Sequence, residues 1–187
     1  MIFQGILHLL TGYDHLAFLF VALLAVVRRR DPNDLQPLRT ATVESLKVVT
    51  AFTVAHSITL TLAATGLVVF ASKPVEAAIA ATVALTALSV FWRPTRFHGW
   101  PLAFAFGLVH GFGFAGALAA MIGGRVSALG IGSFNLGIEV AQISIALALV
   151  PLLYLLAKRR AFDRFVAPAM AATVAGVAMV WFVQRMG

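Results

Sequence analysis

Residues 8–15 read His8-Leu9-Leu10-Thr11-Gly12-Tyr13-Asp14-His15, and they lie inside an apolar run that extends from about residue 3 to Val27. Two imidazoles and a carboxylate occupy a segment whose other side chains are mostly hydrocarbon. A charged group inside a bilayer is costly, so an intramembrane aspartate indicates a functional site. The other polar residues of the apolar segments are therefore candidates to join this one.

The composition is that of an integral membrane protein. Of 187 residues, 61% are hydrophobic and 11% are charged, and the mean hydropathy is +0.96. Soluble domains are about half apolar and roughly a quarter charged. The lipid bilayer is therefore the expected partner. The net charge is +7, and the basic residues lie in short loops. This distribution is typical of residues that set the orientation of a protein in the membrane, and nucleic-acid binding is not expected. The absence of cysteine excludes disulfides and thiolate metal sites.

Hydropathy predicts an all-α polytopic protein, with one domain over residues 1–187 and six transmembrane helices in a single bundle. Each apolar segment reaches the length of about 20 residues that a helix needs to cross a bilayer. The expected spans are about 3–27, 43–71, 75–92, 101–122, 131–157 and 164–184.

The basic residues predict the orientation. Ten of them lie in or beside the loops after the first, third and fifth spans, and three lie on the other side. Positive loops stay in the cytoplasm, so both termini are expected outside it. The expected location is the inner (plasma) membrane, crossed several times, with periplasmic or extracellular N- and C-termini. A homo-oligomer is compatible with the sequence.

In a continuous first helix, His8 and His15 would share one face at a distance of about 10 Å along the axis. Gly12 lies on that face and would allow another helix to approach closely. Asp14 points about 100° away, toward a neighbouring span.

The second, fourth and fifth spans also contain polar groups. His56 lies near the middle of the second span, beside Ser57. His110 follows Gly107 and precedes Gly111, which form a small-residue motif typical of helix packing. The fifth span contains a stripe of three amide or carboxyl groups at i, i+4 and i+7, namely Asn135, Glu139 and Gln142.

Depth along the spans groups these residues. Asp14 and the last three histidines of the set, His15, His56 and His110, are expected at mid-membrane. His8, Asn135 and Glu139 are expected in the outer half, on an entry path. The alternative is a structural role, in which these buried polar groups only form hydrogen bonds with one another. Each polar group inside a membrane costs free energy, so a set of this size is not favoured as a means of joining helices alone. The third and sixth spans, without ionisable groups in their cores, are predicted to be scaffold.

Imidazoles and carboxylates together suit borderline divalent ions such as nickel, cobalt or zinc. They also suit a proton relay. The residues alone therefore predict a metal or proton site in a six-helix bundle. The predicted metal ligands are His8, Asp14, His15, His56, His110 and Glu139, with Ser57, Asn135 and Gln142 as supporting polar groups and Gly12, Gly107 and Gly111 as packing residues.

The pattern His8-x-x-x-Gly12-x-Asp14-His15 resembles the first-helix signature of the HupE/UreJ membrane proteins, nickel and cobalt permeases associated with hydrogenase and urease maturation. Leu9 stands where the fuller pattern has proline, and no glutamate follows His110-Gly111 within its span. Further similarity to the second branch of this family lies in residues 55–60, 107–115 and 134–139.

The resemblance implies a secondary permease with six spans, both termini outside and a metal site at the His-Asp-His group of the first helix. The expected cargo is a divalent ion, with nickel or cobalt favoured and zinc as an alternative. An enzyme is not favoured. The rival hypotheses are an intramembrane zinc hydrolase, with Glu139 as base, and a membrane metal sensor or assembly factor with a static site.

Overall fold

The fold is seen in a computed structural model, which describes residues 1–28, 35–91, 99–114 and 127–187. These residues are almost entirely helical, and no strand occurs among them. The helices are α1 (Ile2–Thr11), α2 (Tyr13–Val27), α3 (Leu38–Ala64), α4 (Ser72–Ser89), α5 (Trp100–Gly113), α7 (Ala128–Ala157), the π-helix η1 (Phe162–Val166) and α8 (Ala167–Met186).

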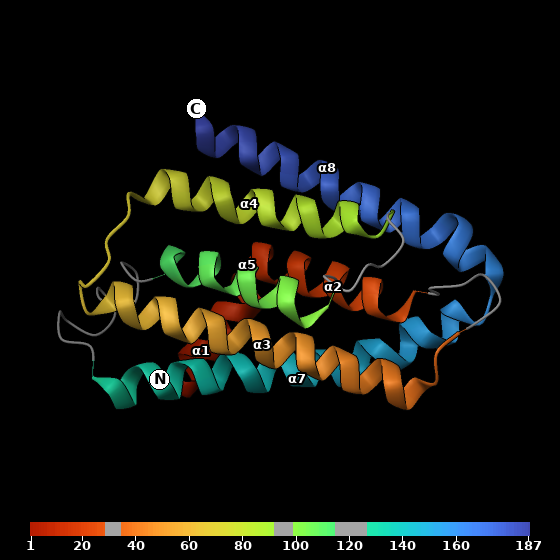
Figure 1. Ribbon diagram of the computed structural model, residues 1–187, viewed down its shortest axis with the longest axis horizontal. Coiled ribbons are helices and arrows are strands. Elements are labelled where there is room, and N and C mark those ends of the chain that lie inside the picture. Colours follow the sequence, from red (N-terminus) through yellow and green to blue (C-terminus); the bar gives the residue numbers. More distant parts are fainter. Residues whose placement is uncertain (29–34, 92–98, 115–126) are drawn as a thin grey trace.

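Most of the helices lie lengthwise beside one another in a bundle (Figure 1). On one side α4 packs against α8, and on the other α3 packs against α7. Between these pairs, α5 contacts both α3 and α4, and α2 contacts α3, α4, α7 and α8. The short α1 packs chiefly against α7. The centre of the bundle is therefore surrounded by α1, α2, α3, α5 and α7.

The first apolar segment is broken and is not one continuous helix. α1 and α2 meet at Gly12 with a bend of 76°. A Cβ at Gly12 would lie 2.8 Å from the His8 carbonyl oxygen and 2.9 Å from His15 Nδ1. Glycine thus leaves room for the His15 ring to lie against the break. The expectation of a straight helix over 3–27 is wrong at this point.

Three helical segments are long and apolar enough to cross a membrane: α3, α7 and Phe162–Met186. The bent pair α1–α2 is a fourth if it counts as one span. α4 does not qualify, since it begins with Lys73 and Glu76, and the described α5 has 14 residues. The helical membrane-protein prediction is confirmed, whereas six spans are not. The end of the expected fourth span, 115–122, lies outside the described residues.

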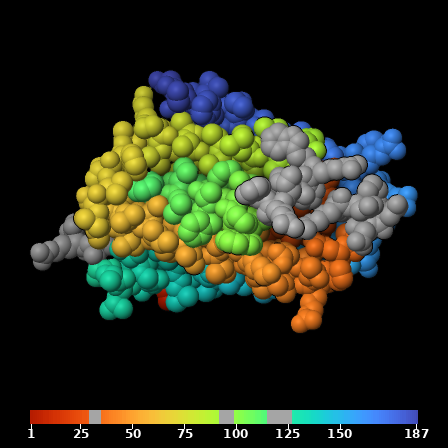
Figure 2. All heavy atoms as spheres, in the orientation of Figure 1, coloured from red at the N-terminus to blue at the C-terminus, as the bar shows by residue number. Residues whose placement is uncertain are grey.

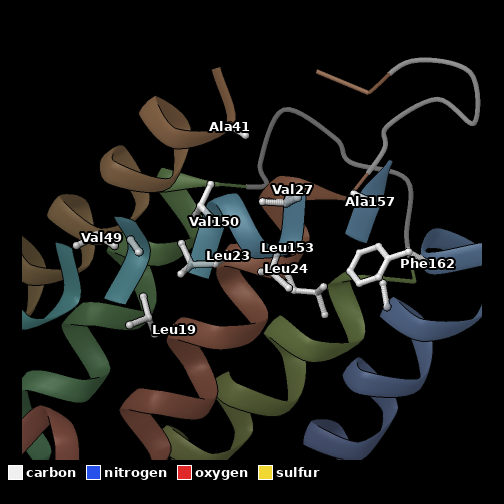
Figure 3. Packing of buried hydrophobic residues seen from close by; sticks show 12 residues of the cluster. Leu19, Leu23, Leu24, Val27, Ala41, Val49, Val150, Leu153, Ala157 and Phe162 are labelled. Atoms are coloured by element: carbon white, nitrogen blue, oxygen red, sulfur yellow. The ribbon is translucent and has the colours of Figure 1, made fainter. Parts of the chain in front are cut away.

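Apolar side chains fill one end of the bundle (Figure 3). Leu23 and Val27 of α2 meet Val150 and Leu153 of α7 there, all of them buried, and Phe162 of η1 closes the cluster. Within a bilayer such a cluster is held by close packing and not by removal from water, because lipid chains are as apolar as leucine. This apolar cluster packs the C-terminal parts of α2 and α7 together.

α3 and α5 approach each other at two glycines. A Cβ at Gly107 would lie 2.5 Å from the Phe52 carbonyl oxygen, and one at Gly111 would collide with Thr59 Oγ1 and the His56 carbonyl oxygen. The lack of a side chain therefore lets the two backbones touch. Figure 2 shows α5 seated between α4 and α3 on one face of the molecule.

Candidate metal site

Four helices each bring one histidine to the centre of the bundle. His8 comes from α1, His15 from the first turn of α2, His56 from α3 and His110 from the last turn of α5. The centre of the His15 ring lies 4.8 Å from that of His8, 5.1 Å from that of His110 and 5.9 Å from that of His56. His15 is therefore the middle member of a four-histidine group.

This geometry differs from the expected separation of about 10 Å between His8 and His15, because the bend at Gly12 folds α1 back toward α2. His8 was expected on an outer entry path. It lies within the group.

Ring nitrogens of His8, His15 and His56 all lie within 4.8 Å of one another. Zinc and similar ions bind imidazole nitrogen at about 2.0–2.1 Å, so two ligands of one ion are at most about 4.2 Å apart. A small inward movement of the side chains would therefore let all three hold one ion. Four buried ring nitrogens have no hydrogen-bond partner among the described residues: Nε2 of His8, His15 and His56, and Nδ1 of His110.

A hydroxyl of α4 fixes the tautomer of His110. The Thr82 hydroxyl donates its proton to the Ile79 carbonyl oxygen at 2.7 Å. Its oxygen then accepts from Nε2–H of His110 at 3.0 Å. Nε2 consequently carries the proton, and the unpartnered Nδ1 keeps a lone pair. This is the arrangement of a metal-binding histidine whose second nitrogen is held by a polar neighbour.

The side-chain amide of Asn135 in α7 fixes the tautomer of His56. The Asn135 side-chain NH₂ donates to the Ile131 carbonyl oxygen at 3.1 Å, which leaves Oδ1 to accept from His56 Nδ1–H at 3.2 Å. The free Nε2 of His56 therefore has a lone pair and lies in the histidine group.

Aromatic rings enclose the histidines. Phe114 and Phe134 stack nearly parallel with centres 4.9 Å apart, and the Phe114 ring centre lies 3.8 Å from that of His8. On the other side, the Phe52 ring centre lies 5.1 Å from that of His110 and stacks on Phe18. Aromatic rings therefore form much of the lining of the histidine group.

Asp14 is not among the residues whose ligand atoms meet in the histidine group. Its carboxylate Oδ2 accepts from Arg185 Nη2 at 2.9 Å, in a half-buried ion pair between α2 and α8. Arg185 also donates to the Glu76 carbonyl oxygen at 3.1 Å. The pair joins the α1–α2 break to the last turn of α8, just beyond the expected sixth span of 164–184.

Glu139 and its neighbours lie between α3 and α7. Glu139 Oε1 accepts from the Thr50 hydroxyl at 2.7 Å, and Gln142 Oε1 accepts from Thr53 at 2.7 Å. Ser57 donates to the carbonyl oxygen of Thr53. Among the described residues, no carboxylate joins the group of ring nitrogens within 4.8 Å.

The chain was compared with known protein families. A model of the HupE / UreJ protein family matches residues 1–185, essentially the whole chain. The chain belongs to the HupE/UreJ family. No curated protein and no solved structure matches it. Its apolar helices and its family together make it a membrane protein.

Two residues of this HupE/UreJ protein that the sequence reasoning did not single out support the site. Thr82 orients His110, and Arg185 pairs with Asp14. Thr82 lies on one helix face with Thr86 and Ser89, at spacings of four and three. This row of hydroxyls in an apolar helix was the sequence feature that could have indicated Thr82 as a site residue. A basic residue at the end of an apolar helix was the signal for Arg185.

Chemically, the group offers neutral nitrogen ligands in an apolar enclosure. Such ligands bind borderline divalent ions but do not neutralise their charge. The arrangement therefore suits a borderline divalent ion.

Proposed function

We propose that this HupE/UreJ protein is a permease for a divalent transition-metal ion, with nickel or cobalt as the cargo and zinc as an alternative. The observation that carries the proposal is the set of four buried, unpartnered ring nitrogens of His8, His15, His56 and His110. Two of the four rings have tautomers that leave a lone pair free. A permeation site must bind an ion yet release it.

We propose six membrane crossings, with α1–α2 as one broken crossing, and both termini on the periplasmic or outer side of the inner membrane. Both chain ends lie toward the same side of the view in Figure 1, as an even number of crossings requires. The end of α2, the start of α3 and the end of α7 lie at the opposite end, and they contain Arg28, Arg39 and Lys158. That distribution of charge favours a cytoplasmic location for this end.

In the hydrolase alternative, Glu139 is the expected base beside a catalytic metal. The two candidate carboxylates have other partners, since Asp14 pairs with Arg185 and Glu139 accepts from Thr50. The ligand geometry therefore favours transport. In this proposal Asp14 acts through its ion pair and Glu139 acts outside the histidine group, so neither is a ligand of the central ion.

Metal accumulation in cells tests the proposal. Cells that express the wild type should accumulate nickel or cobalt above a vector control, and His15→Ala and His56→Ala should abolish the excess. Thr173→Ala is the matched control, because its exposed hydroxyl only donates to Ala169 within α8. Accumulation by both histidine variants at the wild-type level would overturn the proposal. A static sensor predicts binding of the metal to purified protein without any accumulation.

A further inference from the structure

A groove of about 450 Å³ opens between α3 and α7. Figure 2 shows these two helices side by side along one edge of the molecule. Nine residues line the groove, five of them polar: Thr53, Ser57, Thr61, Ala128, Ile131, Gly132, Asn135, Leu136 and Glu139. The exposed lining of the groove is mostly apolar, and these five polar residues contribute a small polar part of it.

The hydroxyls on α3 present oxygen lone pairs to this groove. Ser57 donates its proton to the Thr53 carbonyl oxygen at 2.7 Å, and Thr61 donates to the Ser57 carbonyl oxygen at 2.7 Å. Because each proton is used within the helix, the hydroxyl oxygens remain as acceptors. Acceptors of this kind can bind the water shell of a cation.

Glu139 supplies negative charge at the same place. It is half-buried, and one of its oxygens is held by the Thr50 hydroxyl at 2.7 Å. No lysine, arginine or histidine forms an ion pair with it among the described residues. An uncompensated carboxylate beside an apolar wall attracts cations more strongly than an exposed one does.

Asn135 connects the groove to the histidine group. It lines the groove one helical turn before Glu139, and its Oδ1 accepts from His56 Nδ1 at 3.2 Å. Ser57, which also lines the groove, directly follows His56 in α3. On the side of α1, the Phe114 and Phe134 rings lie against His8, which is half-buried, whereas the other three histidines are buried.

We propose that the α3–α7 groove is the entrance for the divalent cation, with Glu139 as a first, weak binding site and Asn135 as the boundary to the histidines. This inference rests on the proposed function. It keeps Asn135 and Glu139 of the expected entry path and leaves out His8. The hydrated cation meets Glu139 first and exchanges water for the oxygens of Ser57 and Asn135. It then passes to the ring nitrogens.

The test measures how fast Co(II) reaches the histidines in purified, detergent-solubilised protein, by stopped-flow absorption of the cobalt–imidazole bands. Glu139→Gln keeps the size and the acceptor for Thr50 but removes the charge. We expect its association rate constant to fall by about tenfold at low ionic strength, with the final absorption unchanged. The control is Glu44→Gln, whose carboxylate pairs with Lys47 at an exposed site.

The chain contains no cysteine, so single cysteines can be labelled without background. A bulky thiol reagent attached to Ser57→Cys should block Co(II) association, whereas the same reagent on Val180→Cys, exposed on α8, should not. The entrance proposal is overturned if Glu139→Gln matches Glu44→Gln in rate, or if labelled Ser57→Cys binds Co(II) as fast as labelled Val180→Cys. These rates require no transport, so a failure of the permease proposal would appear separately, as absent accumulation by the wild type.

Discussion

The close contact between α3 and α5 at Gly107 predicts that a larger residue there lowers both stability and Co(II) affinity. In Gly107→Ala, the new Cβ would lie 2.5 Å from the Phe52 carbonyl oxygen and 2.9 Å from the Ala55 Cβ. To reach 3.0–3.4 Å, the two backbones must separate by roughly 0.5–0.9 Å. Overpacking of this kind costs about 1–3 kcal/mol of stability. His110 lies less than one turn beyond Gly107, so the movement carries it away from His56.

Metal sites tolerate ligand displacements of about 0.2 Å, so we expect the Co(II) affinity to fall by about tenfold or more, equivalent to ~1.4 kcal/mol. The assay is a calorimetric titration of purified protein, together with the thermal unfolding midpoint. Gly176→Ala is the matched control, because nothing lies within 4 Å of a Cβ there. If Gly107→Ala and Gly176→Ala have the same midpoint and the same affinity, the reasoning about helix approach is refuted.

Three further substitutions test other contacts of the site. Thr82→Val leaves Nε2–H of His110 without its acceptor, and should lower Co(II) affinity by about 10–100-fold in a titration. Asp14→Asn should lower the unfolding midpoint in detergent by removing the charge opposite Arg185, and the exchange Asp14→Arg with Arg185→Asp should restore part of it; no restoration would mean that the pair is not formed. In Gly5→Ala the Cβ would collide with the Phe134 carbonyl oxygen, so tryptic cleavage should accelerate relative to Gly176→Ala.

The sequence predicted the helical membrane class and the approximate positions of the apolar segments. Within a bilayer the backbone must form its own hydrogen bonds, so a long apolar run folds as a helix. It did not predict the break at Gly12. Depth was counted at 1.5 Å per residue along a straight helix, and a bend of 76° invalidates that count. His8 was therefore expected far from His15, although their ring centres lie 4.8 Å apart.

The meeting of His15, His56 and His110 was expected from their common depth, and the structure places them in one group. The partners of Asp14 and Glu139 could not be derived in this way. Depth gives the position of a side chain along the membrane normal only. Which neighbouring side chain it contacts depends on how each helix is rotated about its axis and packed against the others. Arg185 is 171 residues from Asp14 in sequence, and no local pattern links them.

Uptake of radioactive Co(II) by sealed proteoliposomes that contain only this protein tests the central claim most directly. We predict saturable, time-dependent uptake above empty vesicles by the wild type and by Thr173→Ala, and uptake at the level of empty vesicles by His15→Ala and His56→Ala. Detergent-solubilised wild type should also bind Co(II), and the two histidine variants should bind it at least tenfold more weakly. Wild-type vesicles that accumulate no more Co(II) than empty ones, although the protein binds the ion, would contradict the account and indicate a static metal site.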